Sequence, residues 1–137
     1  MVSRKILLDS SVVIAFYNIK DIQYKKALKE VQSLAGKNVV LHLHPLIILE
    51  TLTVLKQKIG KEGVLECEKD FLDANLYVWD KVSLTLHETD SWRKIFYEKN
   101  TLSVIDAMLL RYAIENDLEL VTFDKELEKV YKRERRN

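Results

Sequence analysis

The chain alternates between short apolar runs and longer stretches in which apolar residues recur every three or four positions. The short runs have the length and the β-branched content of buried strands, whereas the recurring pattern is that of amphipathic helices. Gly36 and Gly60 end two of the helical stretches, and Pro45 suits the first turn of the second. The predicted strands are Lys5–Leu8, Val39–His44, Asn75–Trp79 and Leu118–Phe123.

The predicted helices lie between the strands, and a last helix follows the fourth strand, which gives the order β-α-α-β-α-α-β-α-α-β-α. Parallel strands joined through helices need right-handed crossovers, so the sheet should be mostly parallel with helices on both faces. We therefore predict an α/β fold, a single-domain α/β/α sandwich around a four- to five-stranded sheet. The clearest helical stretches are 22–34, 45–60, 64–72, 92–96, 103–116 and 125–131.

Length and composition fit one domain over residues 1–137. The chain is 47% hydrophobic and 31% charged, so it can bury a core. Cys67 is its one cysteine, which excludes a disulfide framework and favours a reducing compartment. No apolar run approaches the roughly 20 residues that cross a bilayer. We expect a cytoplasmic protein with no membrane partner.

Charge is unevenly distributed, although the net charge is only +1. Residues 129–137 carry five basic side chains and one acidic one, a net +4, so the rest of the chain carries 1 − 4 = −3. A basic C-terminal tail of this kind attracts nucleic acid, but it is also the composition of a solvated helix end. The tail alone favours the second interpretation.

Two aspartates directly follow predicted strands. Asp9 comes after the first strand and Asp124 after the fourth, which places both at the edge of a parallel sheet where ligands bind in open α/β folds. An aspartate between a strand and a helix is also a favoured N-cap, which stabilises the helix by about 1 kcal/mol. Taken singly, each is better explained as a cap.

Another acid, Glu50, stands in an apolar helical stretch. It shares its helical face with Leu46 and Val54, and burying an unpaired carboxylate is costly. A salt bridge to Lys56 or Lys58 is the alternative, although neither lysine has the favourable spacing of three or four residues from the acid.

Asp106 is the fourth acid, and it follows Ser103 by three residues, the spacing of a capping box. The same helical face carries Leu102, Leu109 and Leu110. Capping therefore explains the serine better than it explains an acid on a buried face.

Two histidines, His42 and His44, are two positions apart and so share one face of the predicted second strand. No cysteine or third histidine stands at a zinc-binding spacing from them. We expect them to be strand residues near the edge of the sheet rather than metal ligands.

Together, the four acids are placed to converge on one cleft. Two carboxylates about 4 Å apart repel each other by roughly 4 kcal/mol at an effective dielectric of about 20, and a hard divalent cation removes that repulsion. Mg²⁺ or Mn²⁺ takes carboxylate and water oxygens and leaves positions for a substrate phosphate. The chemistry that follows is metal-assisted hydrolysis of a phosphodiester.

The order of these motifs resembles the PIN-domain family: ILLDSS, an isolated Glu in the helix after the second strand, LSVIDAMLL and LVTFDKEL. The resemblance runs from about residue 4 to residue 131, and small VapC-type toxin ribonucleases of toxin–antitoxin pairs are similar throughout. It implies an endoribonuclease that uses Mg²⁺ or Mn²⁺ and leaves 3′-hydroxyl and 5′-phosphate ends on RNA.

The resemblance also implies a role for each site residue. Asp9 and Asp106 are the principal metal ligands. Glu50 and Asp124 complete the site, directly or through water, and help to position the attacking water. The side chains implied or expected to support these carboxylates through hydrogen bonds are Ser10, Ser11, Ser103 and Thr122.

Partners follow from the same resemblance. Small members commonly form homodimers, and a toxin is blocked by a cognate antitoxin in its cleft, so we expect both partners beside RNA. Two alternatives stay open: a catalytically silent PIN-like module that binds RNA or protein, and an RNA-processing nuclease without an antitoxin. The sequence does not reveal the RNA target.

Overall fold

The computed structural model describes residues 3–34, 38–80, 86–98 and 101–136. The strands and helices in this part of the chain alternate as predicted. In chain order they are β1 (Arg4–Leu8), α1 (Ser10–Tyr17), α2 (Tyr24–Leu34), β2 (Val39–Leu43), α3 (Pro45–Phe71), β3 (Val78–Trp79), α4 (Leu86–Glu98), α5 (Val104–Glu115), β4 (Glu119–Val121) and α6 (Lys125–Arg135).

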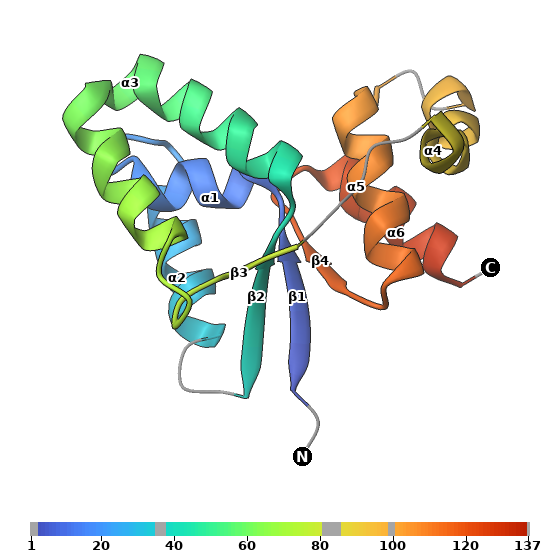
Figure 1. Ribbon diagram of the computed structural model, residues 1–137, viewed down its shortest axis with the longest axis horizontal. Coiled ribbons are helices and arrows are strands. Elements are labelled where there is room, and N and C mark those ends of the chain that lie inside the picture. The colour runs from blue at the N-terminus through green and yellow to red at the C-terminus, as the bar shows by residue number, and fades with distance from the viewer. Residues whose placement is uncertain (1–2, 35–37, 81–85, 99–100, 137) are drawn as a thin grey trace.

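The four strands form one sheet in the order β3-β2-β1-β4, and every neighbouring pair is parallel. Figure 1 shows α1, α2 and α3 on one side of this sheet and α4, α5 and α6 on the other. The predicted α/β/α sandwich with a mostly parallel sheet is therefore confirmed. Strand β1 lies inside the sheet, between β2 and β4.

Both faces of β1 are buried. Ile6 and Leu8 pack against α1 and α3, whereas Leu7 packs into a separate cluster under α4, α5 and α6, because successive side chains of a strand point to opposite faces. All three are at most 2% exposed, and burying each contributes about 1.5–3 kcal/mol. The end of β1, where Asp9 follows, is thus fixed from both sides.

Strands β3 and β4 are each three residues shorter than predicted. The expected strand Asn75–Trp79 begins only at Val78, since Asp73 opens a turn in which its Oδ1 accepts from Asn75 N at 2.9 Å. The expected strand Leu118–Phe123 ends at Val121. Beyond it, the backbone N–H groups donate to side-chain hydroxyls near Asp9 instead of to another strand.

Gly60 separates two helical segments within α3, as the sequence predicted. This glycine has φ 80° and ψ 176°, outside helical geometry. Positive φ costs glycine little because it has no Cβ. The first helical segment therefore ends at this glycine, and the second follows it at a kink.

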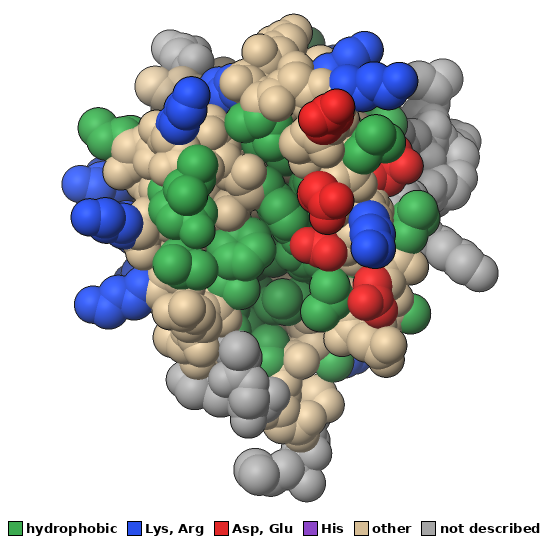
Figure 2. All heavy atoms as spheres, turned by 90° about the vertical axis from the view of Figure 1, so that its left-hand side faces the viewer, with side chains coloured by type: hydrophobic (Ala, Val, Ile, Leu, Met, Phe, Trp, Pro, Cys, Tyr) green, Lys and Arg blue, Asp and Glu red, His purple; other side chains and the backbone are tan. Residues whose placement is uncertain are grey.

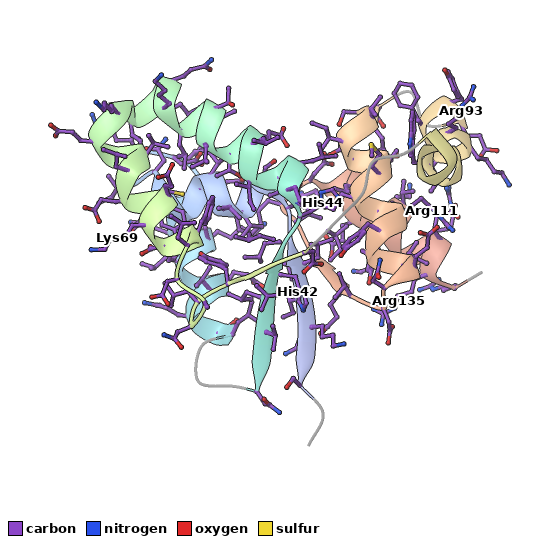
Figure 3. The ribbon with its side chains drawn as sticks, viewed as in Figure 1. His42, His44, Lys69, Arg93, Arg111 and Arg135 are labelled. Carbon is purple, nitrogen blue, oxygen red and sulfur yellow. The ribbon has the colours of Figure 1, made fainter. Side chains whose placement is uncertain are left out.

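The prediction for His44 was wrong. Strand β2 ends at Leu43, and His44 is the N-cap of α3, where its Nδ1 accepts from Leu46 N at 3.1 Å. Burial lowers the pKa of His44, which keeps the ring neutral and able to accept. His42 does lie on β2, but that strand is flanked by β1 and β3 and is not at the edge of the described sheet (Figure 3).

An apolar hollow opens on the surface near the end of α3. Figure 2 views the molecule from the side of α2 and α3, where hydrophobic side chains gather. Leu72 is 67% exposed and Val78 is 40% exposed. Together with Phe71, Ala74 and Tyr77 they line a hollow of about 360 Å³.

None of the helices in the described ranges is long and apolar enough to cross a membrane.

Candidate active site

Asp9 occupies the N-cap position of α1 but does not act as a cap. Its side chain accepts no capping hydrogen bond from the helix. Instead, its Oδ2 accepts from Ser11 Oγ at 2.8 Å and from Thr122 Oγ1 at 2.7 Å, and the residue is only 4% exposed. The capping interpretation therefore fails for the first acid, whose carboxylate is buried and held by hydroxyl groups.

The hydroxyls of Ser11 and Thr122 connect Asp9 to the loop after β4. Thr122 Oγ1 donates to Asp9 and accepts from Asp124 N at 3.0 Å. Ser11 Oγ likewise accepts from Phe123 N at 3.0 Å. Each hydroxyl thus uses its donor on Asp9 and its acceptor on the backbone before α6, which sets the distance between the carboxyl ends of β1 and β4.

Asp124 is the N-cap of α6. Its Oδ1 accepts from Glu126 N at 3.0 Å and from Leu127 N at 3.1 Å, so the predicted capping role is confirmed. Two bonds to one oxygen fix the orientation of this carboxylate at the start of α6.

Asp106 forms the predicted capping box with Ser103. Ser103 Oγ accepts from Asp106 N at 3.1 Å, and Asp106 Oδ2 accepts from Ser103 N at 3.2 Å. Burial, and then the charges of Asp9 and Asp124, raise the pKa of Asp106 against the opposing effect of the Ser103 hydrogen bonds. Asp106 therefore both closes the capping box and lies near other acids, so the two interpretations are compatible.

Glu50 lies in the second turn of α3 and points its charge toward the same acids. No ion pair with Lys56, Lys58 or any other cation reaches it within the described ranges. Burial, and then the charges of Asp9 and Asp106, raise the pKa of Glu50, while a hydrogen bond with Ser10 opposes the shift. Asp9 and Asp106 therefore lie near enough to Glu50 for their charges to affect its pKa.

Carboxylate oxygens are the ligands that a hard divalent cation prefers, although these side chains do not form a complete coordination shell. Among the described residues, no group of three His, Cys, Asp or Glu side chains is close enough to hold an ion outright. Mg²⁺ does not require such a group, because it is bound by one or two carboxylates and keeps several waters. Burial and, after it, the charges of the neighbouring acids raise the pKa of Asp106 and of Glu50, and a cation would favour the charged form of both.

A cation and an aromatic ring beside the site were not predicted. Lys26 of α2 places its Nζ 4.6 Å from the centroid of Phe123, the residue directly before Asp124. Cation–π pairs between distant segments leave no spacing signal in a sequence. The contact puts a positive charge at the rim of an acidic site.

A second unpredicted group lies on the α5 side of the sheet. Asp80, after β3, accepts from Tyr112 OH at 2.5 Å, and its Oδ1 lies 2.6 Å from His42 Nδ1. The ring of His44 meets that of Tyr112 edge-on at 4.9 Å. Burial and the bond to Asp80 raise the pKa of Tyr112, so the phenol stays a donor. This group ties β2 and β3 to α5, the helix that carries Asp106.

Comparison with known proteins places the chain in a structural context. A family model described as the PIN domain matches residues 6–133. The solved structure of VapC20 from Mycobacterium tuberculosis, described as a toxin that cleaves the sarcin–ricin loop, is similar in fold with a TM-score of 0.76. The two share 17% sequence identity over 91% of this chain and 94% of that one. No curated protein sequence matches the chain.

Proposed function

The chain belongs to the PIN domain family, and on that premise we propose that it is a metal-dependent endoribonuclease that hydrolyses RNA phosphodiester bonds. We further propose that it is the toxin of a type II toxin–antitoxin pair. The fold shared with VapC20, described as cleaving the sarcin–ricin loop, supports RNA as the class of substrate.

The observation that carries the proposal is the environment of Asp9. A carboxylate that only capped α1 would accept from the helix, yet Asp9 accepts from Ser11 and Thr122 and makes no capping bond. Burying a charged carboxylate costs free energy unless the charge is paired and hydrogen-bonded. A cation bound at Asp9 would supply that pairing. The electrostatic proximity of Glu50 and Asp106 supports the same conclusion.

In this proposal Asp9 and Asp106 hold Mg²⁺ or Mn²⁺, and Glu50 and Asp124 complete the site. When bound, such an ion lowers the pKa of a water and neutralises charge on the phosphate and the leaving oxygen. Ser11 and Thr122 fix Oδ2 of Asp9, which leaves Oδ1 without a hydrogen-bond partner among the described residues.

Glu50 has the role of orienting the attacking water. Its raised pKa makes the carboxylate a better hydrogen-bond and proton acceptor than an exposed acid. The Ser10 hydroxyl lies close enough to Glu50 to favour its charged form, which opposes the rise in its pKa. Ser103 donates its backbone N–H to Asp106 in the capping box and so fixes the orientation of that carboxylate.

The proposal includes two protein partners. A homodimer is supported by the apolar hollow around Leu72 and Val78, since exposed apolar surfaces of this kind mark interaction sites. An antitoxin is proposed to cover the acidic cleft. A short neighbouring reading frame that encodes a DNA-binding protein, and co-purification of its product with this chain, would distinguish a toxin from a processing enzyme.

The test of the proposed activity is an RNA digestion. The purified chain is incubated with a diverse RNA pool and Mn²⁺, and the product ends are mapped by ligation and sequencing. We expect cleavage that stops on chelation and leaves 3′-hydroxyl and 5′-phosphate ends. RNA that stays intact after incubation with Mn²⁺, and also with Mg²⁺, would instead favour a catalytically silent binding module.

A further inference from the structure

A hollow of about 350 Å³ lies along one face of α6. Val130, only 2% exposed, is its apolar base. The lining side chains recur every three or four positions, the spacing that places residues on one face of a helix. They are Glu126, Lys129, Val130, Lys132, Arg133 and Arg136.

The charge of this hollow is strongly positive. Four cations against one carboxylate give it a net charge of +3. Lys132 pairs with Glu128 at 2.9 Å and Arg133 with Glu134 at 3.2 Å, but surface pairs of this kind contribute little and exchange readily. Lys129 and Arg136 make no ion pair within the part of the chain that the structure describes.

The hollow reaches the first turn of α6, next to Asp124. Glu126, which lines it, donates its backbone N–H to Oδ1 of Asp124 at 3.0 Å. At about 1.5 Å of rise per residue, Arg136 lies roughly 18 Å along the helix from Asp124. In a stacked helical strand a phosphate recurs about every 3.4 Å of the axis, so this face is as long as about five stacked nucleotides.

We propose that this face of α6 binds the phosphodiester backbone of the substrate RNA, several nucleotides from the bond that is cut. The inference rests on the proposed ribonuclease function, because it extends the substrate path from the carboxylates along α6, the helix that Asp124 caps. Lys129 and Arg136 are the principal contacts, since neither must break an ion pair to bind a phosphate. The contacts carry no sequence preference, because phosphates are the same in every nucleotide.

The experiment measures RNA binding by the full chain without divalent metal, as a function of salt. The probe is a labelled oligouridylate of about 12 nucleotides. For a single strand, each phosphate contact contributes about −0.7 to the slope of the logarithm of the binding constant against the logarithm of the salt concentration. Lys129→Gln with Arg136→Gln removes two contacts and should flatten the slope by roughly 1.4. If the variant and the unaltered chain bind equally at about 1 M salt, the variant should bind about 25-fold more weakly at about 0.1 M.

The matched control is Lys58→Gln with Lys61→Gln, which removes the same charge from exposed positions on α3. Its slope and affinity should equal those of the unaltered chain. An unchanged slope in the α6 variant, or an equal loss in the control, would overturn the proposal. Tighter binding of an oligoglutamate peptide than of RNA would also overturn it, by assigning the face to an acidic protein.

A cleavage assay separates this inference from the proposed function. With Mn²⁺, the α6 variant should cut a trinucleotide as the unaltered chain does, because so short a substrate does not reach Arg136. Its KM for the longer RNA should rise about 25-fold with kcat unchanged. Normal cleavage of both RNAs by the variant would reject the subsite and keep the nuclease, whereas altered binding without any cleavage would do the reverse.

Discussion

The hydroxyl of Thr122 donates a hydrogen bond of 2.7 Å to Oδ2 of Asp9, across 113 positions of the chain. The same oxygen of Thr122 accepts from the backbone N–H of Asp124. One side chain thus sets the position of a carboxylate at the end of β1 relative to another at the start of α6, and this link makes the first prediction.

Thr122→Val should lower the rate of RNA cleavage by about 10- to 100-fold, the usual cost of removing a hydrogen bond that orients a metal ligand. The substitution keeps the shape of the side chain but removes both the donor to Asp9 and the acceptor for Asp124. The measurement is kcat/KM with saturating Mn²⁺.

Two further variants control for Thr122→Val. Thr122→Ser should restore most of the rate, because it returns the hydroxyl. Thr53→Val removes an exposed hydroxyl that donates to Leu49 O, and it should have no effect. A valine variant as active as the unaltered chain would show that the bond to Asp9 does not matter for catalysis.

Divalent metal should raise the melting temperature of the chain, because a ligand that binds only the folded state stabilises it. Asp106→Asn should be more stable than the unaltered chain without metal, since it removes a carboxylate whose pKa is raised by burial and by Asp9, while an amide oxygen still completes the box with Ser103. The same variant should lose most of the metal-dependent shift. A clear loss of metal-free stability would indicate that the box, not repulsion, dominates at this position.

Leu72→Asp should shift a dimer toward monomer in sedimentation experiments, since it places a charge in the exposed apolar hollow beside Val78. Ile22→Asp is the control, because Ile22 is 99% exposed and lies outside that hollow. If neither substitution alters the mass in solution of a dimeric chain, the copies meet at another surface.

The ion pair between β1 and β4 gives a pH prediction. Arg4 Nε and Nη2 donate to Glu119 at 2.9 and 3.0 Å, and these bonds lower the pKa of Glu119. A lowered folded-state pKa contributes stability above the unfolded-state pKa, which is lost as the pH falls through the folded value. Glu119→Gln should therefore melt slightly lower than the unaltered chain at neutral pH only.

The pH series needs one comparison. The effect of Glu119→Gln is small, because the pair with Arg4 is exposed to solvent. Glu62→Gln, an exposed position on α3, should leave the melting temperature unchanged at every pH. A difference at Glu119 that persisted in acid would have to come from packing rather than charge.

The sequence predicted the fold well because periodicity and burial are local properties. The apolar run before Asp9 could only be a strand buried on both faces, and Leu7 and Leu8 are indeed buried against opposite helical layers. Gly60 illustrates the limit. Its non-helical backbone separates two helical segments as predicted, but the angle at which the second segment leaves the first is not specified by the local pattern.

The candidate site was predicted in its residues but not in its contacts. Strand ends place Asp9 and Asp124 at one edge of the sheet, which follows from parallel topology alone. That Asp124 caps its helix while Asp9 does not depends on the hydroxyls of Ser11 and Thr122. These are contacts between residues more than 100 positions apart, so no spacing rule reveals them.

The central claim is that Asp9 is a metal ligand and not a helix cap, and the most direct test is Asp9→Asn assayed for RNA cleavage with Mn²⁺. An asparagine retains capping ability and nearly the same volume, and its one oxygen can still accept from Ser11 and Thr122, whereas the charge and the second acceptor oxygen are lost. Asp73→Asn, at an exposed turn where Oδ1 accepts from Asn75 N, is the control. We predict that Asp9→Asn lowers kcat/KM by at least about 10²-fold and Asp73→Asn leaves it unchanged; full activity of Asp9→Asn would contradict the account.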